Sequence, residues 1–446
     1  MTLPASEAPQ SLFVWTWLPG KTNPVVAGRL VERPGRLDFV YGESYLRRTN
    51  AISLYSPELP LRAGVTPPLP GLDMPGCIRD GSPDAWGRRV IDSRLGVGDF
   101  DLTELRYLIE SGSNRFGALD FQTSPTQYVP RDEAATLDEL HEAAIMVDDG
   151  RPLPQPLAEA LIRGTSIGGA RPKALLVDSD GTQWIAKFSS SSDTHFSVPN
   201  AEGATMILAQ HAGIDVCEVR VTSSLGREIL LVRRFDRTSA GGRIHAVSAL
   251  TMSGEGELGA RYVTYPQILA VLERHSGSHE PVGPALFRRI VFNVAVSNSD
   301  DHARNHAALW DGTHLRLSPA YDLCPGPRSG QTAQQAMAFG RSGIRTSTFA
   351  ACISVAAEYG LRAHEARAVV DEVASAISDH FHEAADEARM SSADRKAMLG
   401  RQFLNPGALH GMPTSFAVPT PAGDRCGAPR ASDGMPCRRL GKCPYH

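Results

Sequence analysis

A polar octapeptide, NSDDHARN at residues 298–305, follows directly on an apolar run at residues 286–296. The run LFRRIVFNVAV has the pattern of a mostly buried helix. The octapeptide contains two carboxylates, a histidine, an arginine and two side-chain amides, and burying such groups without partners is costly. The helix must therefore end at an open polar site, and this site constrains the fold more than any other segment.

The residues after this loop predict a β-hairpin. HAALW and THLRL flank an Asp-Gly pair at residues 311–312, which suits a two-residue type I′ turn. A hairpin returns the chain to its starting point, so the segment SPAYD at residues 318–322 is expected beside Asn305. Asp322 should then share one pocket with Asp300 and Asn305.

The spacing and residue types of this pocket point to phosphoryl transfer. Asp300 precedes Asn305 by five residues, as in the D-x-x-x-x-N loop of protein kinases, where a later Asp binds Mg²⁺. A carboxylate can accept the proton of an attacking hydroxyl, and amide and carboxylate oxygens suit Mg²⁺. We therefore predict Asp300 as the base and Asn305 with Asp322 as Mg²⁺ ligands. His302 is expected to orient the loop rather than titrate.

Candidate nucleotide-binding residues precede this loop in the order that a kinase requires. SIGGARPK, at residues 166–173, has a glycine pair whose backbone N–H groups can approach phosphate closely. Lys187 in WIAKF resembles the lysine of V-A-I-K strands, and Glu202 on the next helix can pair with it. The strand ending near Phe235 is expected to connect two lobes and to floor an adenine pocket. Each signal is weak alone, since a glycine pair is usually a plain turn, but their common order favours one ATP site.

Composition limits the class of molecule. The 446 residues are 42% hydrophobic and 21% charged, which is typical of several globular domains. A net charge of −4 gives no whole-chain attraction for nucleic acid. The first residues lack a signal-peptide pattern, no apolar stretch of ~18 residues occurs, and seven scattered cysteines suit reduced thiols. We expect a cytoplasmic protein without membrane contact.

These motifs also resemble the HipA family of serine/threonine kinases, the toxins of type II toxin–antitoxin modules. The matching stretches are SIGGARPKALL, WIAKF, RRFDR, SALTM, NSDDHARNHA and LSPAYDLCP, with SPDAWGRR and SGSNRFGALDF nearer the N-terminus. The resemblance covers roughly residues 12–402, and NSDDHARN with PAYD is its most specific part. It implies ATP and Mg²⁺ as cofactors.

The resemblance assigns roles to individual residues. It implies catalytic roles for Asp300, His302 and Arg304, and Mg²⁺ binding by Asn305 and Asp322. ATP-binding positions are Ser166, Ile167, Gly168, Gly169, Ala170, Lys173, Lys187, Glu202, Arg234, Phe235 and Tyr321. Ser166 is the implied autophosphorylation site, with Thr165 as the rival acceptor. The sequence departs from some relatives at Arg233, where they carry an acidic residue.

The resemblance also implies partners. Family members are restrained by a small DNA-binding antitoxin, so a HipB-like partner is expected and DNA is contacted only through it. Family targets include aminoacyl-tRNA synthetases, so such an enzyme is a candidate substrate. Nothing in the sequence identifies the target.

Together, the patterns predict an α+β, bilobal protein-kinase-like fold with a β-rich N-terminal part and an all-α C-terminal lobe. A HipA-like β-rich subdomain is expected at 1–125, a kinase N-lobe with the Gly-rich loop at 126–240, and a helical C-lobe with the catalytic loop at 241–403. In the first region, Ser82 is the expected N-cap of a helix.

The remaining residues, 404–446, form a tail rich in Pro, Gly and Cys. Its Cys426, Cys437, Cys443 and His446 provide the three sulfurs and one imidazole of a recognised structural zinc set. The alternative is a tail with free surface thiols, because the ligand spacing is irregular.

Rival functions remain open at this point. A metal-dependent phosphohydrolase or nuclease could use Asp300, Asp301, His302 and Asp322, but it would leave Lys187 without a role. A non-catalytic co-repressor working with a DNA-binding antitoxin would not need the catalytic residues. A lipid or small-molecule kinase could share the same pocket.

Overall fold

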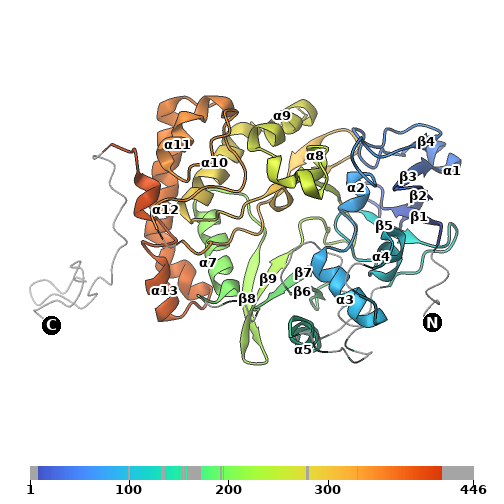
Figure 1. Ribbon diagram of the computed structural model, residues 1–446, viewed down its shortest axis with the longest axis horizontal. Helices are drawn as coiled ribbons and strands as arrows, with labels where there is room; N and C mark the ends of the chain where they lie inside the picture. Colours follow the sequence, from blue (N-terminus) through green and yellow to red (C-terminus); the bar gives the residue numbers. More distant parts are fainter. Residues whose placement is uncertain are drawn as a thin grey trace, which may run out of the picture.

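The computed structural model describes residues 9–98, 101–131, 136–149, 151, 154, 157, 172–190, 193, 195–277, 281–328 and 330–413. Three antiparallel sheets organise this part of the chain, with five, four and three strands. Figure 1 shows the first sheet at one end of the molecule, the second near the middle and the long C-terminal helices at the other end. The fold is thus a mixture of helices and antiparallel sheets.

The first sheet lies in the region predicted to be β-rich and has the strand order β4-β3-β2-β1-β5. Its strands are β1 Ser11–Thr16, β2 Val25–Arg33, β3 Arg36–Tyr41, β4 Val65–Thr66 and β5 Leu119–Gln122. Its helices are α1 Glu43–Leu46, α2 Gly76–Arg79, α3 Ala85–Leu95 and α4 Glu104–Glu110.

The predicted N-cap of α3 is wrong by two residues. Asp84, not Ser82, caps this helix, because its carboxylate accepts a hydrogen bond from the backbone N–H of Gly87 at 2.8 Å. Asp is as good an N-cap as Ser, and the Ser82 hydroxyl instead lies 3.9 Å from the sulfur of Met74.

The second sheet has the order β6-β7-β9-β8, with a helix on each face. It contains β6 Lys173–Val177, β7 Gln183–Phe188, β8 Val219–Ser224 and β9 Arg227–Arg233, and the helices are α5 Leu137–Asp148 and α7 Val198–His211. The alternation of strand side chains separates two faces: Ile229 belongs to the core beneath α5, and Leu230 to the core that contains α7. This arrangement supports Lys187 from both sides of its strand.

The C-terminal part is not all-α, contrary to the prediction. It contains the sheet β10-β11-β12, formed by β10 His245–Ser248, β11 Ala307–Trp310 and β12 Leu315–Leu317. Its helices are α8 Ala249–Met252, α9 Tyr265–His275, α10 Val282–Ala295, α11 Phe349–Ser354, α12 Ala363–Glu387 and α13 Ser392–Met398, and its 3-10 turns are η1 Glu257–Tyr262, η2 Ala303–Asn305, η3 Ala356–Tyr359 and η4 Pro406–Leu409. The third strand arises because β10, distant in sequence, pairs with the predicted hairpin.

The hairpin reverses the chain as predicted, but its turn is longer. Trp310 pairs with Leu315, so residues 311–314 form a four-residue loop instead of a two-residue turn. The Asp311 carboxylate accepts hydrogen bonds from the backbone N–H groups of Thr313 and His314 at 2.8 and 2.7 Å. These hydrogen bonds from the backbone to the Asp311 side chain stabilise the longer loop in place of a type I′ turn.

A buried charged cluster connects the first sheet to the end of β9. We call it the junction network, and its members are Asn114, Arg115, Arg234, Asp236 and Arg237. Arg234 donates to the Asp236 carboxylate at 2.9 and 2.7 Å, to the Asn114 side chain at 2.9 Å and to the carbonyl of Arg115 at 2.6 Å. The Asp236 carboxylate also accepts from the Gly117 N–H at 2.7 Å. The network fixes the first sheet against the second.

Among the described helices, none combines the length and apolar content needed to cross a membrane.

Candidate active site

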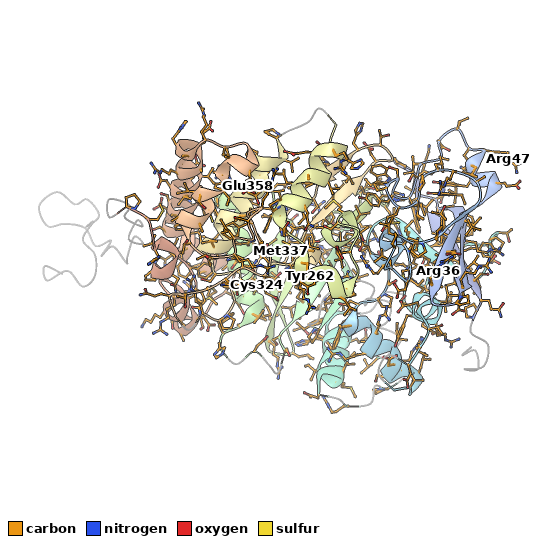
Figure 2. The ribbon with its side chains drawn as sticks, turned by 45° about the horizontal axis from the view of Figure 1, so that its top comes forward. Arg36, Arg47, Tyr262, Cys324, Met337 and Glu358 are labelled. Carbon is orange, nitrogen blue, oxygen red and sulfur yellow. The ribbon has the colours of Figure 1, made fainter. Side chains whose placement is uncertain are left out.

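The centre of the candidate site is Lys187, on β7. Its ammonium lies 2.5 Å from the Glu202 carboxylate on α7 and 2.5 Å from the Asp322 carboxylate after β12. The predicted pairing of Glu202 with Lys187 is therefore present, and three elements distant in sequence converge on one cation. Figure 2 labels Cys324, two residues beyond Asp322, near the middle of the molecule.

The charges in this group support one another. Burial alone would lower the pKa of Lys187, but the Asp322 and Glu202 carboxylates outweigh it and raise that pKa. Loss of hydration alone would raise the pKa of Asp322, but the Lys187 ammonium holds it at about 2. Lys187 and Asp322 are consequently both charged at neutral pH, and the Asp322 side chain is still 42% exposed.

A second lysine lies beside the first. Lys173 on β6 faces Lys187 across the β6–β7 pair, and its ammonium lies 3.3 Å from the Asp84 carboxylate. Burial lowers the pKa of Lys173, while the negative charges of Asp84 and Asp322 oppose that shift. The two ammonium groups are paired with the carboxylates of Asp84, Glu202 and Asp322. They also bring together N–H donors of the kind that bind an anion such as phosphate. No local sequence pattern indicates the contact between Asp84 and Lys173, because the two residues lie in distant segments of the chain.

The two carboxylates of the catalytic loop have opposite environments. Asp301 is 2% exposed, and it accepts hydrogen bonds from the Tyr265 hydroxyl and from His306 Nε2, the latter at 2.9 Å. Asn293 on α10 donates to the Tyr265 hydroxyl at 3.2 Å. Asp300 is exposed, and no hydrogen-bond partner for it occurs in the described chain. The loop is thus anchored by one carboxylate while the other faces outward.

The remaining loop residues connect to the Asp322 segment. The Tyr321 hydroxyl donates to the Arg304 carbonyl at 2.8 Å, so the hairpin does bring residues 318–322 beside the loop. His302 contributes to the low pKa of Asp322, and its Nδ1 is buried without a hydrogen-bond partner in the described residues. The Arg304 guanidinium pairs with Glu257. Asn305 is 8% exposed.

The strand end expected to floor an adenine pocket carries an aromatic stack. The rings of Phe235 and Tyr321 lie 5.5 Å apart with an angle of 24° between their planes, and Phe116 meets Phe235 edge-on at 6.0 Å. The Arg234 guanidinium belongs to the junction network, so only its backbone is available to a nucleotide.

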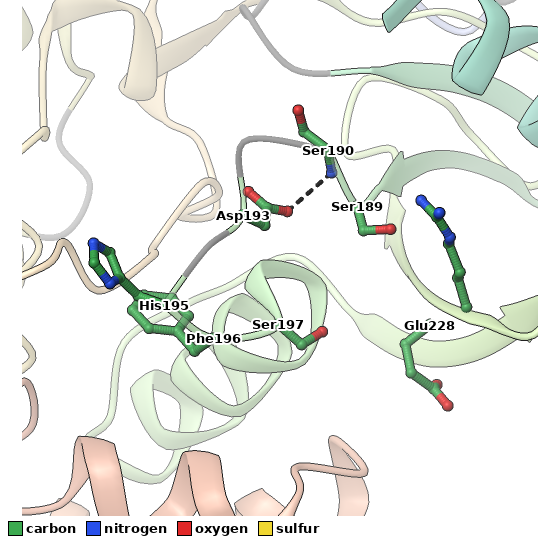
Figure 3. Close-up of a pocket in the computed structure, with 8 residues that line it drawn as sticks. Ser189, Ser190, Asp193, His195, Phe196, Ser197 and Glu228 are labelled. Carbon is green, nitrogen blue, oxygen red and sulfur yellow. Dashed lines mark hydrogen bonds between the residues drawn. The ribbon is translucent and has the colours of Figure 1, made fainter. Parts of the chain in front are cut away.

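Several predicted positions lie outside the described residues. They are Thr165, Ser166, Ile167, Gly168, Gly169 and Ala170 of the Gly-rich loop, and Cys426, Cys437, Cys443 and His446 of the tail. The cavity shown in Figure 3, of about 470 Å³, is not the candidate site: it lies past the end of β7, between Ser189, Ser197 and Glu228. It lacks the lysine and the loop carboxylates on which the chemistry depends.

The fold and this site together define a HipA-like protein. Residues 21–122 match the family model of the HipA N-terminal domain, and residues 165–381 match that of the HipA-like C-terminal domain. The chain belongs to the HipA family.

Two relatives are each 28% identical to this chain over the residues that align. One is "Putative kinase Y4mE" of Sinorhizobium fredii, aligned over 323 residues, which are 66% of this chain and 75% of the relative. The other is "Putative kinase" of Haemophilus influenzae, aligned over 180 residues, which are 36% of this chain and 52% of the relative.

The fold is similar to that of HipA from Shewanella oneidensis MR-1, solved with HipB and operator DNA. The TM-score is 0.63 at 16% identity, and the match covers 89% of this chain and 99% of that one. This likeness extends over both family domains.

Proposed function

We propose that this protein is an ATP- and Mg²⁺-dependent serine/threonine protein kinase with a bilobal kinase-like fold, acting as the toxin of a type II toxin–antitoxin module. The observation that supports this proposal most is the group Lys187, Glu202 and Asp322. A lysine paired with a helix carboxylate and lying beside a second carboxylate is the arrangement that kinases use to hold nucleotide phosphates. The names of the two relatives point to the same activity.

The residues at the site fit Mg²⁺ and ATP. One Asp322 oxygen bonds Lys187, and the other has no hydrogen-bond partner in the described residues. With the amide oxygen of Asn305, it provides the hard oxygen donors that Mg²⁺ prefers. ATP with Mg²⁺ would supply the transferable phosphoryl group and neutralise its charge.

The chain's own residues would then divide the work. Lys187 and Lys173 bind phosphate oxygens, and Glu202 keeps Lys187 directed at them. Asp300 accepts the proton of the acceptor hydroxyl on its carboxylate, which is exposed and has no competing partner in the described chain. Asp301 fixes the loop through Tyr265 and His306, so that Asp300 keeps its position.

We further propose that the kinase phosphorylates its own Ser166. A hydroxyl in a loop that covers ATP lies close to the transferred group, and a phosphoserine would add about −1.5 to −2 charges beside the nucleotide phosphates. Repulsion should then weaken ATP binding, so Ser166→Asp should bind ATP less tightly than wild type.

The proposed partner is a HipB-like antitoxin, because the similar Shewanella oneidensis structure is a complex with HipB and operator DNA. DNA would be contacted through that partner, since the net charge of −4 does not favour direct binding. The protein acceptor, for which an aminoacyl-tRNA synthetase is the candidate, would be phosphorylated in the cytoplasm.

The test is incubation of the full chain with ATP labelled in its γ-phosphate, with and without Mg²⁺, followed by mapping of phosphopeptides. We expect Mg²⁺-dependent label on Ser166 of the wild type and none on the Ser166→Ala variant. Label on Thr165 instead would identify Thr165 as the acceptor residue and would leave the kinase proposal unchanged. Lys187→Met should lower the transfer rate by about 10²- to 10³-fold, by loss of a charge aimed at phosphate. If the wild type binds ATP but transfers no phosphate to its own chain or to other proteins, the kinase proposal fails.

The tail is proposed separately as a zinc staple of Cys426, Cys437, Cys443 and His446. So short a segment has little core of its own, so metal binding would have to supply its order. Elemental analysis should find a zinc that is lost when the three cysteines are replaced by serine.

A further inference from the structure

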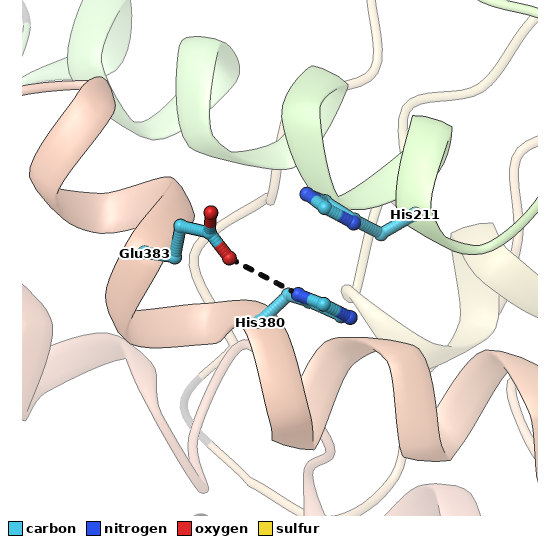
Figure 4. A group of neighbouring side chains, drawn as sticks. All are labelled: His211, His380 and Glu383. Atoms are coloured by element: carbon cyan, nitrogen blue, oxygen red, sulfur yellow. Dashed lines mark hydrogen bonds and ion pairs between the residues drawn. The ribbon is translucent and has the colours of Figure 1, made fainter.

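A cluster of three potential metal ligands lies on the helical side of the molecule, away from the candidate active site. His211 is the last residue of α7, and His380 and Glu383 lie on α12. One donor atom from each lies within 4.8 Å of the others. Figure 4 shows the two imidazole rings facing each other between the helices, with the Glu383 carboxylate beside them.

The packing of the two helices brings these residues together. The Asn200 side chain, near the start of α7, donates to the Ala388 carbonyl at the end of α12 at 2.8 Å. The end of α7 lies beside His380, in the second half of α12, because the rings of His211 and His380 stack. The two helices therefore run antiparallel. His380 and Glu383 are three residues apart, which places them on one helix face. The backbone thus fixes the cluster before any ligand arrives.

The present contacts leave much of the donor capacity of the cluster unused. His380 Nδ1 lies 3.2 Å from a Glu383 oxygen, and the two rings stack at 3.9 Å between centroids with 11° between their planes. No hydrogen bond to a His211 ring nitrogen occurs in the described part of the chain. His211 is exposed and the Glu383 side chain is 68% exposed, so water and ions can reach all three donors.

Local charge also favours a cation here. The last turn of a helix carries partial negative charge on its free carbonyls, and His211 occupies that turn of α7. The nearby Arg288 guanidinium is already paired with Glu372 at 2.6 Å and with the Ala212 carbonyl at 3.0 Å. Two stacked imidazoles would repel each other if both were protonated, whereas both can act as neutral ligands of one metal ion.

We propose that His211, His380 and Glu383 bind one divalent transition-metal ion, with Zn²⁺ as the cellular candidate. Two imidazole nitrogens and one carboxylate oxygen are an established zinc donor set, with water in the fourth position. Hard ions such as Mg²⁺ and Ca²⁺ prefer all-oxygen ligands and are disfavoured. Lone pairs of parallel rings do not converge, so one ring must rotate on binding, and the exposed His211 is free to do so.

Such an ion would join α7 to α12. Because α7 also carries Glu202, which holds Lys187 at 2.5 Å, metal binding would stabilise the helix that positions this lysine. This last consequence rests on the proposed kinase function, but metal binding itself does not.

The test is a calorimetric titration of the full chain with Zn²⁺ in the absence of ATP. The three tail cysteines are replaced by serine, so that the proposed tail site does not contribute. We expect one binding event, weakened at least about tenfold by His211→Ala or His380→Ala and less by Glu383→Gln. His364→Ala, which changes an exposed histidine on the same helix α12, is the matched control and should bind as the parent does.

Thermal unfolding with and without Zn²⁺ adds a second readout, since at one Zn²⁺ concentration the ion should raise the melting temperature of the parent and of His364→Ala more than that of His211→Ala or His380→Ala. The side chains of His211, His364 and Glu383 are exposed and that of His380 is half-buried, so their replacement should leave the fold intact, which can be verified without metal. Absence of Zn²⁺ binding by the parent, or equal affinity in His211→Ala and His364→Ala, would overturn the site. Either result would leave the kinase proposal intact, because no nucleotide takes part.

Discussion

Arg234 and Lys187 are cations at neighbouring strands of one sheet, and each lies between carboxylate or amide oxygens. The Arg234 guanidinium is buried and bonded to Asp236, to Asn114 and to a backbone carbonyl. Lys187 is also bonded on two sides, but its partner Asp322 is 42% exposed and keeps one oxygen free of described partners. A charged network is called saturated here when its donors and acceptors are all bonded to other protein groups, and such a network holds parts of a protein together. A network that keeps an unbonded oxygen facing solvent can bind a ligand.

The same contrast divides two adjacent residues of the catalytic loop. Asp301 is saturated by Tyr265 and His306, and Asp300 is exposed. Substitution of a charged residue that is buried and fully hydrogen-bonded, such as Asp301, should therefore reduce stability. Substitution of an exposed charged residue without a described partner, such as Asp300, should reduce activity.

The largest change in stability is expected at the junction network. Arg234→Met would leave the Asp236 carboxylate buried with one fewer cation, and breaking a buried pair on one side costs about 3–5 kcal/mol. The matched control is Arg233→Met, because Arg233 pairs with Glu218 at the surface, where the side chains are 47% and 42% exposed, and such pairs contribute at most about 1 kcal/mol. Urea unfolding of both variants measures the difference. Equal losses would show that burial of the network is not what stabilises the junction.

A smaller effect, dependent on pH, is expected at His245 on β10. Its Nε2 lies 3.0 Å from the Thr16 hydroxyl and 3.0 Å from the Trp17 carbonyl, and burial lowers its pKa from 6.5 to about 4. The unfolded chain therefore binds a proton at higher pH than the folded chain does. Stability from this residue should be complete above pH 6.5 and decline as the pH falls toward 4, by about 3 kcal/mol in total.

His245→Gln should keep a donor for the Trp17 carbonyl and remove this titration. The unfolding free energies of wild type and variant should converge as the pH falls from 6.5 to 4. Parallel curves over that interval would contradict a neutral, buried His245.

The smallest of these changes is expected at Asp301. Asp301→Asn keeps the shape but weakens the bonds to Tyr265 and His306, so we expect a loss of about 2 kcal/mol. Asp300→Asn is the control, and it should change the unfolding free energy by no more than about 0.5 kcal/mol. A larger loss of unfolding free energy in Asp300→Asn than in Asp301→Asn would mean that Asp300, not Asp301, anchors the loop.

Local patterns were sufficient to predict much of this molecule. The β-rich N-terminal region, the strands that carry Lys187 and end near Phe235, the antiparallel hairpin and the α10 helix before the polar loop follow from apolar periodicity and turn residues. Candidate site residues could also be proposed from the sequence, because they follow one another in the order found in kinases. The five-residue spacing and the hairpin further predicted that Asp322 lies near the loop with Asp300 and Asn305.

Long-range pairing accounts for what the sequence did not reveal. The third strand of the C-terminal sheet comes from residues 245–248, about 60 positions before its partner β11. Asp84 reaches Lys173 from another domain. The choice between Asp300 and Asp301 as anchor depends on the direction of each side chain in an irregular loop, which neighbouring residue types do not encode.

The most direct test compares phosphoryl transfer from ATP by wild type and Asp300→Asn, at concentrations that saturate both with Mg²⁺ and ATP. Loss of a positioned base should lower the transfer rate by roughly 10²- to 10⁴-fold, while the ATP dissociation constant and the unfolding free energy stay close to those of wild type. Transfer by Asp300→Asn at the wild-type rate would contradict the account, because the open carboxylate of the loop would then have no part in the chemistry.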